Sequence, residues 1–235
     1  MSEQRTNATI ENDPIALAAI EPIKSGMMVG LGTGLMADRA TRLLAQIVKR
    51  DKLDIRCVAT SLATHRLGSE LGLRLVPFAD VDRVDYLFDG ASEVDHQLRM
   101  LKGHHGAITR QRLIADVSER CVYLTTEDRV SERLGSRALL TVVVIPFGSA
   151  SVRSHLRNLG LSGVLRRDFD GKVFETEGGG VVFDMTFPDR DPKELADELD
   201  HVTGVVDHGI FLNEADEVLV ECKGGEVRRI IALES

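Results

Sequence analysis

In Met27-Met-Val-Gly-Leu-Gly-Thr-Gly34 an apolar segment runs directly into a glycine-rich turn, which is the most informative signal for the fold. Residues 27–31 are predicted to form a strand. Residues 36–48 are predicted to form a helix, because apolar side chains recur on one side of it: Ala37, Ala40, Leu43, Leu44 and Ile47. A strand, a glycine turn and a helix in this order are typical of a parallel sheet covered by helices.

The same alternation continues on both sides of this stretch. A helix is predicted to start at Asn12-Asp-Pro14, where a capping side chain precedes a proline. Further strands are predicted over residues 55–59, 73–76, 84–88 and 122–125, with helices over 62–71 and 107–117. The sequence therefore predicts an α/β fold whose main domain is a parallel sheet with Rossmann-like alternation of strands and helices.

From Ser131 onward the order of elements changes. The sequence predicts a strand over residues 139–145, a helix over 150–159, paired strands over 164–167 and 173–187, and a helix over 192–199. This order indicates a small inserted α+β domain. We expect the main domain to comprise residues 1–131 and 206–235 and the inserted domain residues 132–205, with residues 205–212 and 218–221 returning to the main sheet.

Composition excludes several classes of protein. The 235 residues are 43% hydrophobic and 28% charged, which is typical of a globular chain with a real core. The 29 basic and 37 acidic residues give a net charge of −8 without a cluster of Lys and Arg, so we expect no nucleic-acid partner.

Nothing in the sequence predicts a membrane span or a secretion signal. The longest apolar run, residues 138–147, is interrupted by Thr141 and Pro146 and is far shorter than the roughly 20 residues that a span needs. Residues 1–9 contain no apolar stretch. The three cysteines, Cys57, Cys121 and Cys222, are odd in number and far apart, which favours reduced thiols and a cytoplasmic protein.

Three motifs could carry chemistry. Gly30-Leu-Gly-Thr-Gly34 could present backbone N–H groups to an anion, or could simply be a tight turn. Asp89-Gly-Ala-Ser-Glu93 follows a strand, so Asp89 and Glu93 are candidates for acid–base chemistry, although Asp89 could equally stabilise its own turn. Lys102-Gly-His-His-Gly106 places a lysine and two histidines before a helix; solvated loop histidines are the alternative, and no further ligand cluster favours a metal.

Taken in order, these motifs resemble ribose-5-phosphate isomerase of the A type. The resemblance extends over essentially the whole chain and rests on these segments: Val29-Gly-Leu-Gly-Thr-Gly34, Ala59-Thr-Ser61, Asp89-Gly-Ala-Ser-Glu93, Lys102-Gly103, Ala107-Ile-Thr-Arg110, Ile145-Pro146, Gly204-Val-Val206 and Gly209-Ile-Phe211. It implies an α/β main domain with a small lid domain, a homodimer or homotetramer, and no metal or other cofactor.

The resemblance also implies a reaction. Members of this family interconvert ribose 5-phosphate and ribulose 5-phosphate by opening the sugar ring and moving a proton between C1 and C2 through an enediol. Asp89 and Lys102 match the residues that open the ring, and Glu93 matches the glutamate that ends the same motif. The matching positions for binding a sugar phosphate are Gly32, Thr33, Gly34, Thr60, Ser61, Ser92, Gly103 and Arg129.

Several family positions carry other residues in this sequence. The family's enediol base, a glutamate, is Gln111, whose amide cannot accept a proton at neutral pH. Ser92 replaces a second aspartate, and Leu35-Met36 replaces a Ser-Thr pair that helps to bind the substrate. His104 and His105 stand at two loop glycines, and Glu177-Gly-Gly-Gly180 stands at an Asp-Asn-Gly-Asn hairpin. Two family lysines are also replaced, one in the first helix by Asn12 or Asp13 and another by Arg129.

Two functions remain open. The first is an aldose–ketose isomerase with an altered substrate or impaired turnover, in which His104 or His105 replaces the missing base. The second is a non-catalytic or regulatory protein that binds a sugar, a sugar phosphate or another polyol. Acyl or CoA transfer needs a glutamate nucleophile, for which Glu93 alone is poor support.

Overall fold

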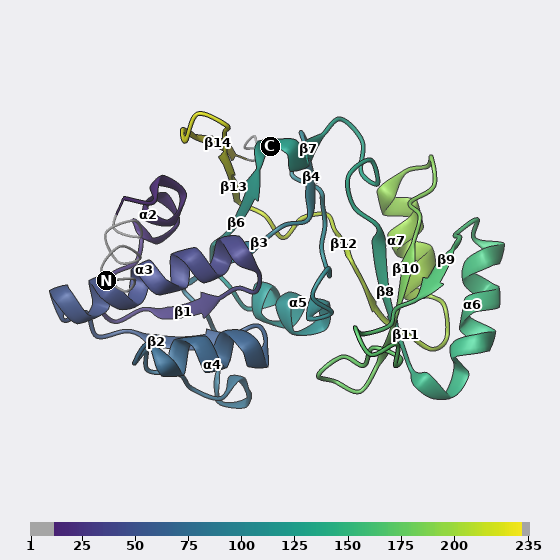
Figure 1. Cartoon of the computed structure of the whole chain (residues 1–235), viewed down its shortest axis with the longest axis horizontal. Coiled ribbons are helices and arrows are strands. Elements are labelled where there is room, and N and C mark those ends of the chain that lie inside the picture. The colour runs from purple at the N-terminus through teal and green to yellow at the C-terminus, as the bar shows by residue number, and fades with distance from the viewer. Residues whose placement is uncertain (1–11, 232–235) are drawn as a thin grey trace. The chain divides into compact units, whose positions relative to one another are not determined.

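The computed structural model describes residues 12–231, which divide into two compact units (Figure 1). Of these residues, the first unit holds 12–90, 110–127 and 214–231, and the second holds 91–109 and 128–213. The sequence-based domain boundaries differ, because they assign residues 91–109, 128–131 and 206–213 to the main domain, whereas the strands of these segments pair within the second unit. The expectation about residues 1–9 lies outside the described residues.

A six-stranded sheet forms the centre of the first unit, in the order β14-β13-β6-β3-β1-β2. The neighbouring strands are parallel, except that β14 runs antiparallel to β13. This sheet confirms the predicted α/β class; β14 was not expected from the sequence. The strands are β1 (Met28–Leu31), β2 (Arg56–Ala59), β3 (Tyr86–Gly90), β6 (Cys121–Thr126), β13 (Glu217–Glu221) and β14 (Val227–Ile231).

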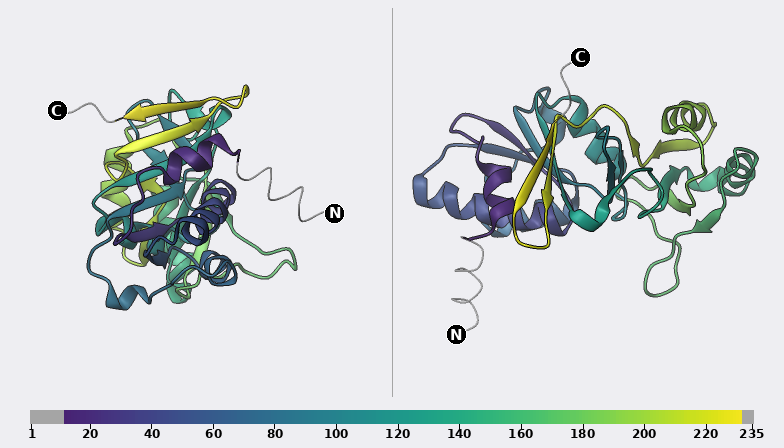
Figure 2. Two further views of the ribbon diagram at one scale, coloured as in Figure 1. Left: turned by 90° about the vertical axis from the view of Figure 1, so that its left-hand side faces the viewer. Right: turned by 90° about the horizontal axis from the view of Figure 1, so that it is seen from above.

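Helices cover both faces of this sheet. The helices are α2 (Pro14–Ile20), α3 (Leu35–Asp51), α4 (Leu62–Glu70) and α5 (Ile108–Asp116), with short 3-10 turns at η1 (Phe78–Asp80) and η2 (Glu127–Arg129). Helices α2 and α3 lie side by side (Figure 2) and bury their apolar side chains against alternate residues of the strands, including Val29, Leu31 and Phe88. Ile114 of α5 approaches the opposite face, where Gly30 leaves room for it.

The start of α2 follows the predicted capping pattern. Asp13 is the N-cap residue, and its side chain accepts a hydrogen bond from the Ala16 N–H at 3.2 Å. Pro14 occupies the first turn, where its missing N–H removes no helical hydrogen bond. This end of α2 is therefore fixed by the Asp13 carboxylate.

The second unit contains a sheet in the order β11-β8-β10-β9, in which all neighbours are antiparallel. Apolar side chains of α6, α7 and this sheet form one buried cluster. A second sheet has the order β12-β5-β4-β7. The elements are β4 (Glu93–Asp95), β5 (Met100–Leu101), β7 (Val130–Ser131), β8 (Leu140–Val144), η3 (Pro146–Gly148), α6 (Ser149–Asn158), β9 (Gly163–Leu165), β10 (Val181–Met185), α7 (Pro192–Asp200), β11 (Val205–His208) and β12 (Ile210–Phe211).

Three predicted strands differ in the structure. Residues 73–76 make only an isolated bridge between Leu75 and Cys57, because Pro77 follows and cannot extend a ladder. Of the strand predicted over residues 173–187, only residues 181–185 form a continuous strand. Residues 205–212 do not return to the main sheet, because β11 pairs with β8 and β12 pairs with β5 in the second unit.

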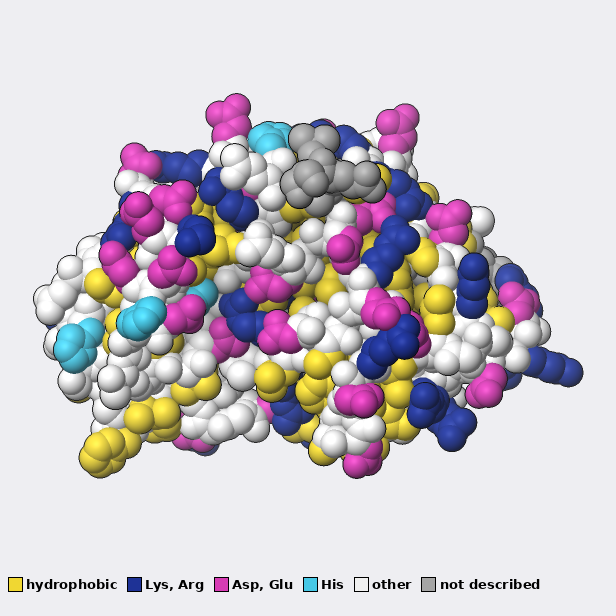
Figure 3. Space-filling view, turned by 180° about the vertical axis from the view of Figure 1, so that it is seen from behind, with side chains coloured by type: hydrophobic (Ala, Val, Ile, Leu, Met, Phe, Trp, Pro, Cys, Tyr) yellow, Lys and Arg dark blue, Asp and Glu magenta, His cyan; other side chains and the backbone are white. Residues whose placement is uncertain are grey.

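The surface carries charges of both signs. Figure 3 shows Lys and Arg side chains interspersed with Asp and Glu over the face that it presents. Several exposed charges are paired, as Arg83 is with Glu119 and Arg50 with Asp51. Within residues 12–231, no helix combines the length and apolar character that crossing a bilayer demands.

Candidate functional site

The glycine turn joins β1 to α3 and lies directly against the end of β3. The Gly32 N–H donates to the Phe88 carbonyl at 2.9 Å. A Cβ on Gly32 would lie 2.3 Å from the Cα of Asp89, so any side chain there would push the turn away from β3. Gly34 caps α3 with φ 108°, a conformation that favours glycine. The turn therefore needs glycine at both positions to reach Asp89.

Asp89 is fully buried at the carboxyl end of β3. Its Oδ1 accepts hydrogen bonds from the backbone N–H groups of Thr33 (2.9 Å) and Gly90 (2.7 Å). The Gln111 side-chain amide, which comes from α5, donates to Oδ1 at 3.0 Å and to Oδ2 at 2.8 Å. The glycine turn, β3 and α5 thus hold one carboxylate from three directions.

Gln111 is itself almost fully buried, with 5% of its surface exposed. Its amide nitrogen is the donor in both contacts with Asp89, so the pair is a donor facing an acceptor. The amide cannot become the proton acceptor of a reaction near neutral pH. Gln111 therefore positions the Asp89 carboxylate in this unit.

Four buried hydroxyl groups lie beside the turn. The Thr33 Oγ1 lies 2.7 Å from that of Thr60 and donates to the Ser61 Oγ at 2.8 Å. Thr64 completes the cluster, and its Oγ1 donates to the Gly32 carbonyl at 2.9 Å. Ser61 is also the N-cap of α4 and accepts from the Thr64 N–H. The sequence analysis missed Thr64, although its place three residues after a capping serine was a usable signal.

Glu93 lies in the second unit and is fully buried. Its Oε1 accepts from the Ser131 hydroxyl (2.6 Å) and the Ser136 N–H (3.0 Å). Its Oε2 accepts from the N–H groups of Gly135 (3.0 Å) and Ala138 (2.9 Å). Both carboxylate oxygens are thus committed to residues 131–138, which favours a structural role over the acid–base role expected from the sequence.

Lys102 is also buried in the second unit, with 1% of its surface exposed. Its Nζ lies 5.5 Å from the centre of the Phe211 ring, within the range of a cation–π contact. The next residue, Gly103, has φ 104°, and a Cβ there would lie 2.5 Å from the Ile108 side chain. The lysine is therefore followed at once by a turn that favours glycine.

Arg166 holds the segment that carries the two histidines. Its Nη1 donates to the carbonyls of Gly103 (3.2 Å) and His104 (2.9 Å). Its Nε donates to Asp184 at 2.8 Å, and its guanidinium lies 5.4 Å from the centre of the Phe174 ring. The sequence analysis missed Arg166, because nothing near it in the chain marks its partner 62 residues away.

The side chains of His104 and His105 are exposed and meet edge to face, with ring centres 5.1 Å apart. Ser92 is half-buried, and its N–H donates to the Leu101 carbonyl at 2.9 Å. Arg129 is exposed and donates to the Arg137 carbonyl at 3.3 Å. These residues all belong to the second unit.

The structure therefore divides the residues singled out from the sequence into two groups. The first unit brings these together around one carboxylate: Gly32, Thr33, Gly34, Thr60, Ser61, Asp89 and Gln111. The second unit contains the others: Ser92, Glu93, Lys102, Gly103, His104, His105 and Arg129.

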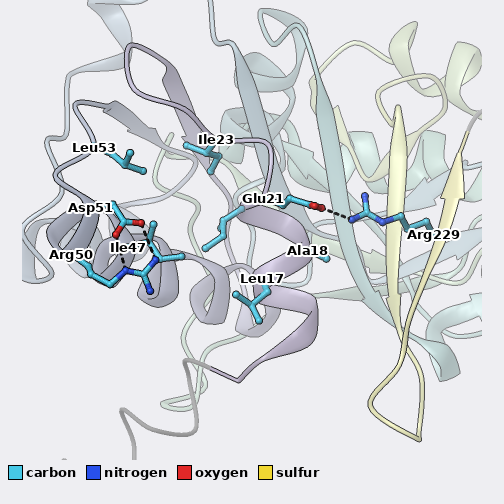
Figure 4. A pocket seen from close by; sticks show the side chains of 10 residues that line it. Leu17, Ala18, Glu21, Ile23, Ile47, Arg50, Asp51, Leu53 and Arg229 are labelled. Atoms are coloured by element: carbon cyan, nitrogen blue, oxygen red, sulfur yellow. Dashed lines mark hydrogen bonds and ion pairs between the residues drawn. The ribbon is translucent and has the colours of Figure 1, made fainter.

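A cavity of about 570 Å³ lies at the other end of α3 from the glycine turn (Figure 4). Apolar side chains of α2 and α3 line it, together with the ion pairs Arg50–Asp51 and Arg229–Glu21. None of the residues gathered around the Asp89 carboxylate lines this cavity. Among residues 12–231, no three or more His, Cys, Asp or Glu side chains form a cluster that could hold a metal ion.

The chain is similar over most of its length to curated isomerases. Residues 56–225 match the family model described as ribose 5-phosphate isomerase A (phosphoriboisomerase A). A ribose-5-phosphate isomerase A from Rhizobium meliloti is 39% identical over 214 residues, which are 87% of this chain and 90% of that protein. The chain spans only 41% of a bifunctional ribokinase/ribose-5-phosphate isomerase A from Fructilactobacillus sanfranciscensis, to which it is 34% identical over 221 residues.

Solved structures agree with the sequence comparison. Ribose 5-phosphate isomerase A from Methanocaldococcus jannaschii superposes with a TM-score of 0.89 at 29% identity, covering 96% of this chain and 99% of that one. A D-ribose-5-phosphate isomerase in complex with phospho-erythronic acid has the same TM-score at 28% identity, covering 95% and 98% of the two chains. With its fold, its matched residues and its relatives in agreement, this chain belongs to the ribose 5-phosphate isomerase A family.

Proposed function

We propose that this chain binds a pentose-type sugar at Asp89 and interconverts its aldose and ketose forms through an enediol. We further propose that its turnover of ribose 5-phosphate is impaired. The observation that carries the proposal is the buried Asp89 carboxylate, held at the end of β3 by the Thr33 N–H and the Gln111 amide. Family membership supports the reaction type.

The proposed chemistry needs a group that moves a proton between C1 and C2. The family resemblance assigns ring opening to Asp89 and Lys102, and proton abstraction to the position of Gln111. Because an amide cannot take that proton, another group must do so. We propose His104 or His105, since imidazole is a competent base near pH 7 and both side chains are exposed.

One observation favours a second candidate function, binding without turnover. Asp89 already accepts hydrogen bonds from two backbone N–H groups and twice from the Gln111 amide. A carboxylate held by so many donors is fixed in place, and its oxygens can accept a hydrogen bond from a sugar hydroxyl at a defined position. The same site would then retain a sugar or polyol unchanged.

The test is solvent deuterium incorporation, because an enediol exchanges the migrating proton with water. The protein is incubated in D2O with ribose 5-phosphate and, separately, with D-ribose, and the sugar is followed by NMR. We expect slow incorporation and ketose formation that disappear in His104→Ala/His105→Ala. The matched control is His155→Ala, an exposed histidine on α6, which should leave the rate unchanged.

Each outcome separates the two candidates. Unchanged activity in the double alanine variant contradicts the histidine assignment, and no incorporation with either sugar contradicts the isomerase. Sugar binding detected by calorimetry in a protein that incorporates no deuterium supports the second candidate.

A further inference from the structure

The guanidinium of Arg39, near the start of α3, is fully occupied by fixed partners. Its Nε and Nη2 donate to the two oxygens of Asp13 at 2.6 and 2.8 Å. Its Nη1 and Nη2 donate to the two oxygens of Glu221 at 2.9 and 2.5 Å. The second donor of Nη1 meets the Met36 sulfur at 3.3 Å. A guanidinium has five N–H donors, so none remains for a ligand.

The two acidic partners of Arg39 come from defined positions, the N-cap of α2 and the end of β13. Asp13 also caps α2 through the Ala16 N–H, and Glu221 is the last residue of β13. Two carboxylates around one guanidinium carry a net charge of −1. An anionic ligand group arriving at this point would therefore meet a surplus negative charge and no available cation on Arg39.

The first turn of α3 begins with two apolar side chains, Leu35 and Met36. Leu35 is 75% exposed and directly follows Gly34, the N-cap residue of α3. Met36 comes next and contacts Arg39 through its sulfur. Asp38 adds a carboxyl group to the same turn. The positive end of the helix, which would otherwise attract a phosphate, thus carries apolar and acidic side chains.

The distance from Asp89 to the first turn of α3 is no longer than a five-carbon sugar. Asp89 accepts from the Thr33 N–H at 2.9 Å, and Leu35 is two residues further along the chain, a separation of at most about 7 Å. A five-carbon sugar with its reacting end at Asp89 is therefore long enough to reach the start of α3.

We propose that the ligand of this site is a pentose whose end at α3 is uncharged and apolar, such as a 5-deoxypentose, rather than a sugar phosphate. The inference rests on the proposed function, because it takes the sugar site to be the one at Asp89. Leu35 and Met36 contact the uncharged end. The Asp13–Arg39–Glu221 cluster, with its net negative charge, disfavours a phosphate.

The first test is calorimetric titration of the full chain with three probes: 5-deoxy-D-ribose, D-ribose and D-ribose 5-phosphate. We expect 5-deoxy-D-ribose to bind at least about tenfold more tightly than ribose 5-phosphate, because the phosphate meets like charge and Arg39 has no N–H donor left to offer it. Tighter binding of ribose 5-phosphate would overturn the inference.

A pair of variants tests the assignment to these residues. Asp13→Asn/Glu221→Gln removes two negative charges while keeping a capping oxygen at position 13, and Leu35→Ser/Met36→Thr introduces hydroxyl groups. Each double variant should tighten binding of ribose 5-phosphate by about tenfold relative to 5-deoxy-D-ribose. Leu35→Ser/Met36→Thr changes half-exposed and exposed positions, so it remains a test if the charge variant fails to fold.

The control is Leu17→Ser, an exposed leucine on α2 that lines the separate cavity, and it should leave the preference unchanged. An unchanged preference in Leu35→Ser/Met36→Thr overturns the assignment. Binding of 5-deoxy-D-ribose without isomerisation supports the inference and contradicts the proposed reaction. Isomerisation of a tightly bound ribose 5-phosphate supports the proposed reaction and contradicts the inference about the ligand. Failure of all three sugars to bind contradicts the proposed reaction and the inference.

Discussion

At the scale of single residues, Asp89 and Glu93 show how one motif yields two different roles. Both carboxylates are fully buried, and each accepts hydrogen bonds from several donors. The donors to Glu93 come from residues 131–138, whereas those to Asp89 include the glycine turn and the Gln111 amide. The sequence predicted that both residues are important. It could not distinguish their roles, because most of their hydrogen-bond partners lie far away in the chain.

Glu93→Ala should destabilise the protein substantially. The change leaves three partly buried backbone N–H groups of residues 135–138 without their acceptor, and the Ser131 hydroxyl keeps only the Arg133 carbonyl. Each unsatisfied donor costs about 1–3 kcal/mol when it is buried. We expect the free energy of unfolding, measured with urea, to fall by about 3 kcal/mol or more. The matched control is Glu132→Ala, an exposed glutamate in the same segment; equal losses in the two variants would refute the structural role.

At the scale of elements, local sequence patterns predicted what depends on local interactions. The strand at β1, the glycine turn and the apolar face of α3 were all predicted, because periodicity and turn chemistry determine them. The pairing of β11 with β8 and of β12 with β5 was not, because the choice of a strand's neighbour depends on contacts between distant residues. The clamp of Arg166 on residues 103–104 escaped prediction for the same reason.

Arg166→Lys should loosen the segment that carries the histidines. A lysine ammonium keeps the charge, but it lacks the planar guanidinium. That group donates at the same time to the Gly103 and His104 carbonyls and to Asp184. We expect faster amide hydrogen exchange over residues 103–107, measured by mass spectrometry. Arg167→Lys is the control, because Arg167 bonds the Gly171 carbonyl within its own hairpin. Equal exchange in both variants would show that Arg166 does not hold the segment.

At the scale of the whole molecule, the sequence predicted the fold class and the family. It placed the boundaries between the units differently, since β4 and β5 belong by pairing to the second unit. The resemblance to the family predicts departures from it at the residues that would abstract a proton or receive a phosphate. In the structure the Gln111 amide bonds Asp89, and the Arg39 guanidinium is saturated by Asp13 and Glu221.

We propose that the amide at position 111 limits the reaction, and comparing Gln111→Glu with the unchanged protein tests this. The rate of ribulose 5-phosphate formation is measured at one fixed concentration of ribose 5-phosphate, so that weak binding affects both proteins alike. A restored carboxylate base should raise the rate by about 100-fold or more, the usual contribution of a positioned general base. Gln97→Glu, at an exposed position, is the control for the added charge. Equal rates for Gln111→Glu and the unchanged protein would show that the amide at position 111 does not limit the reaction.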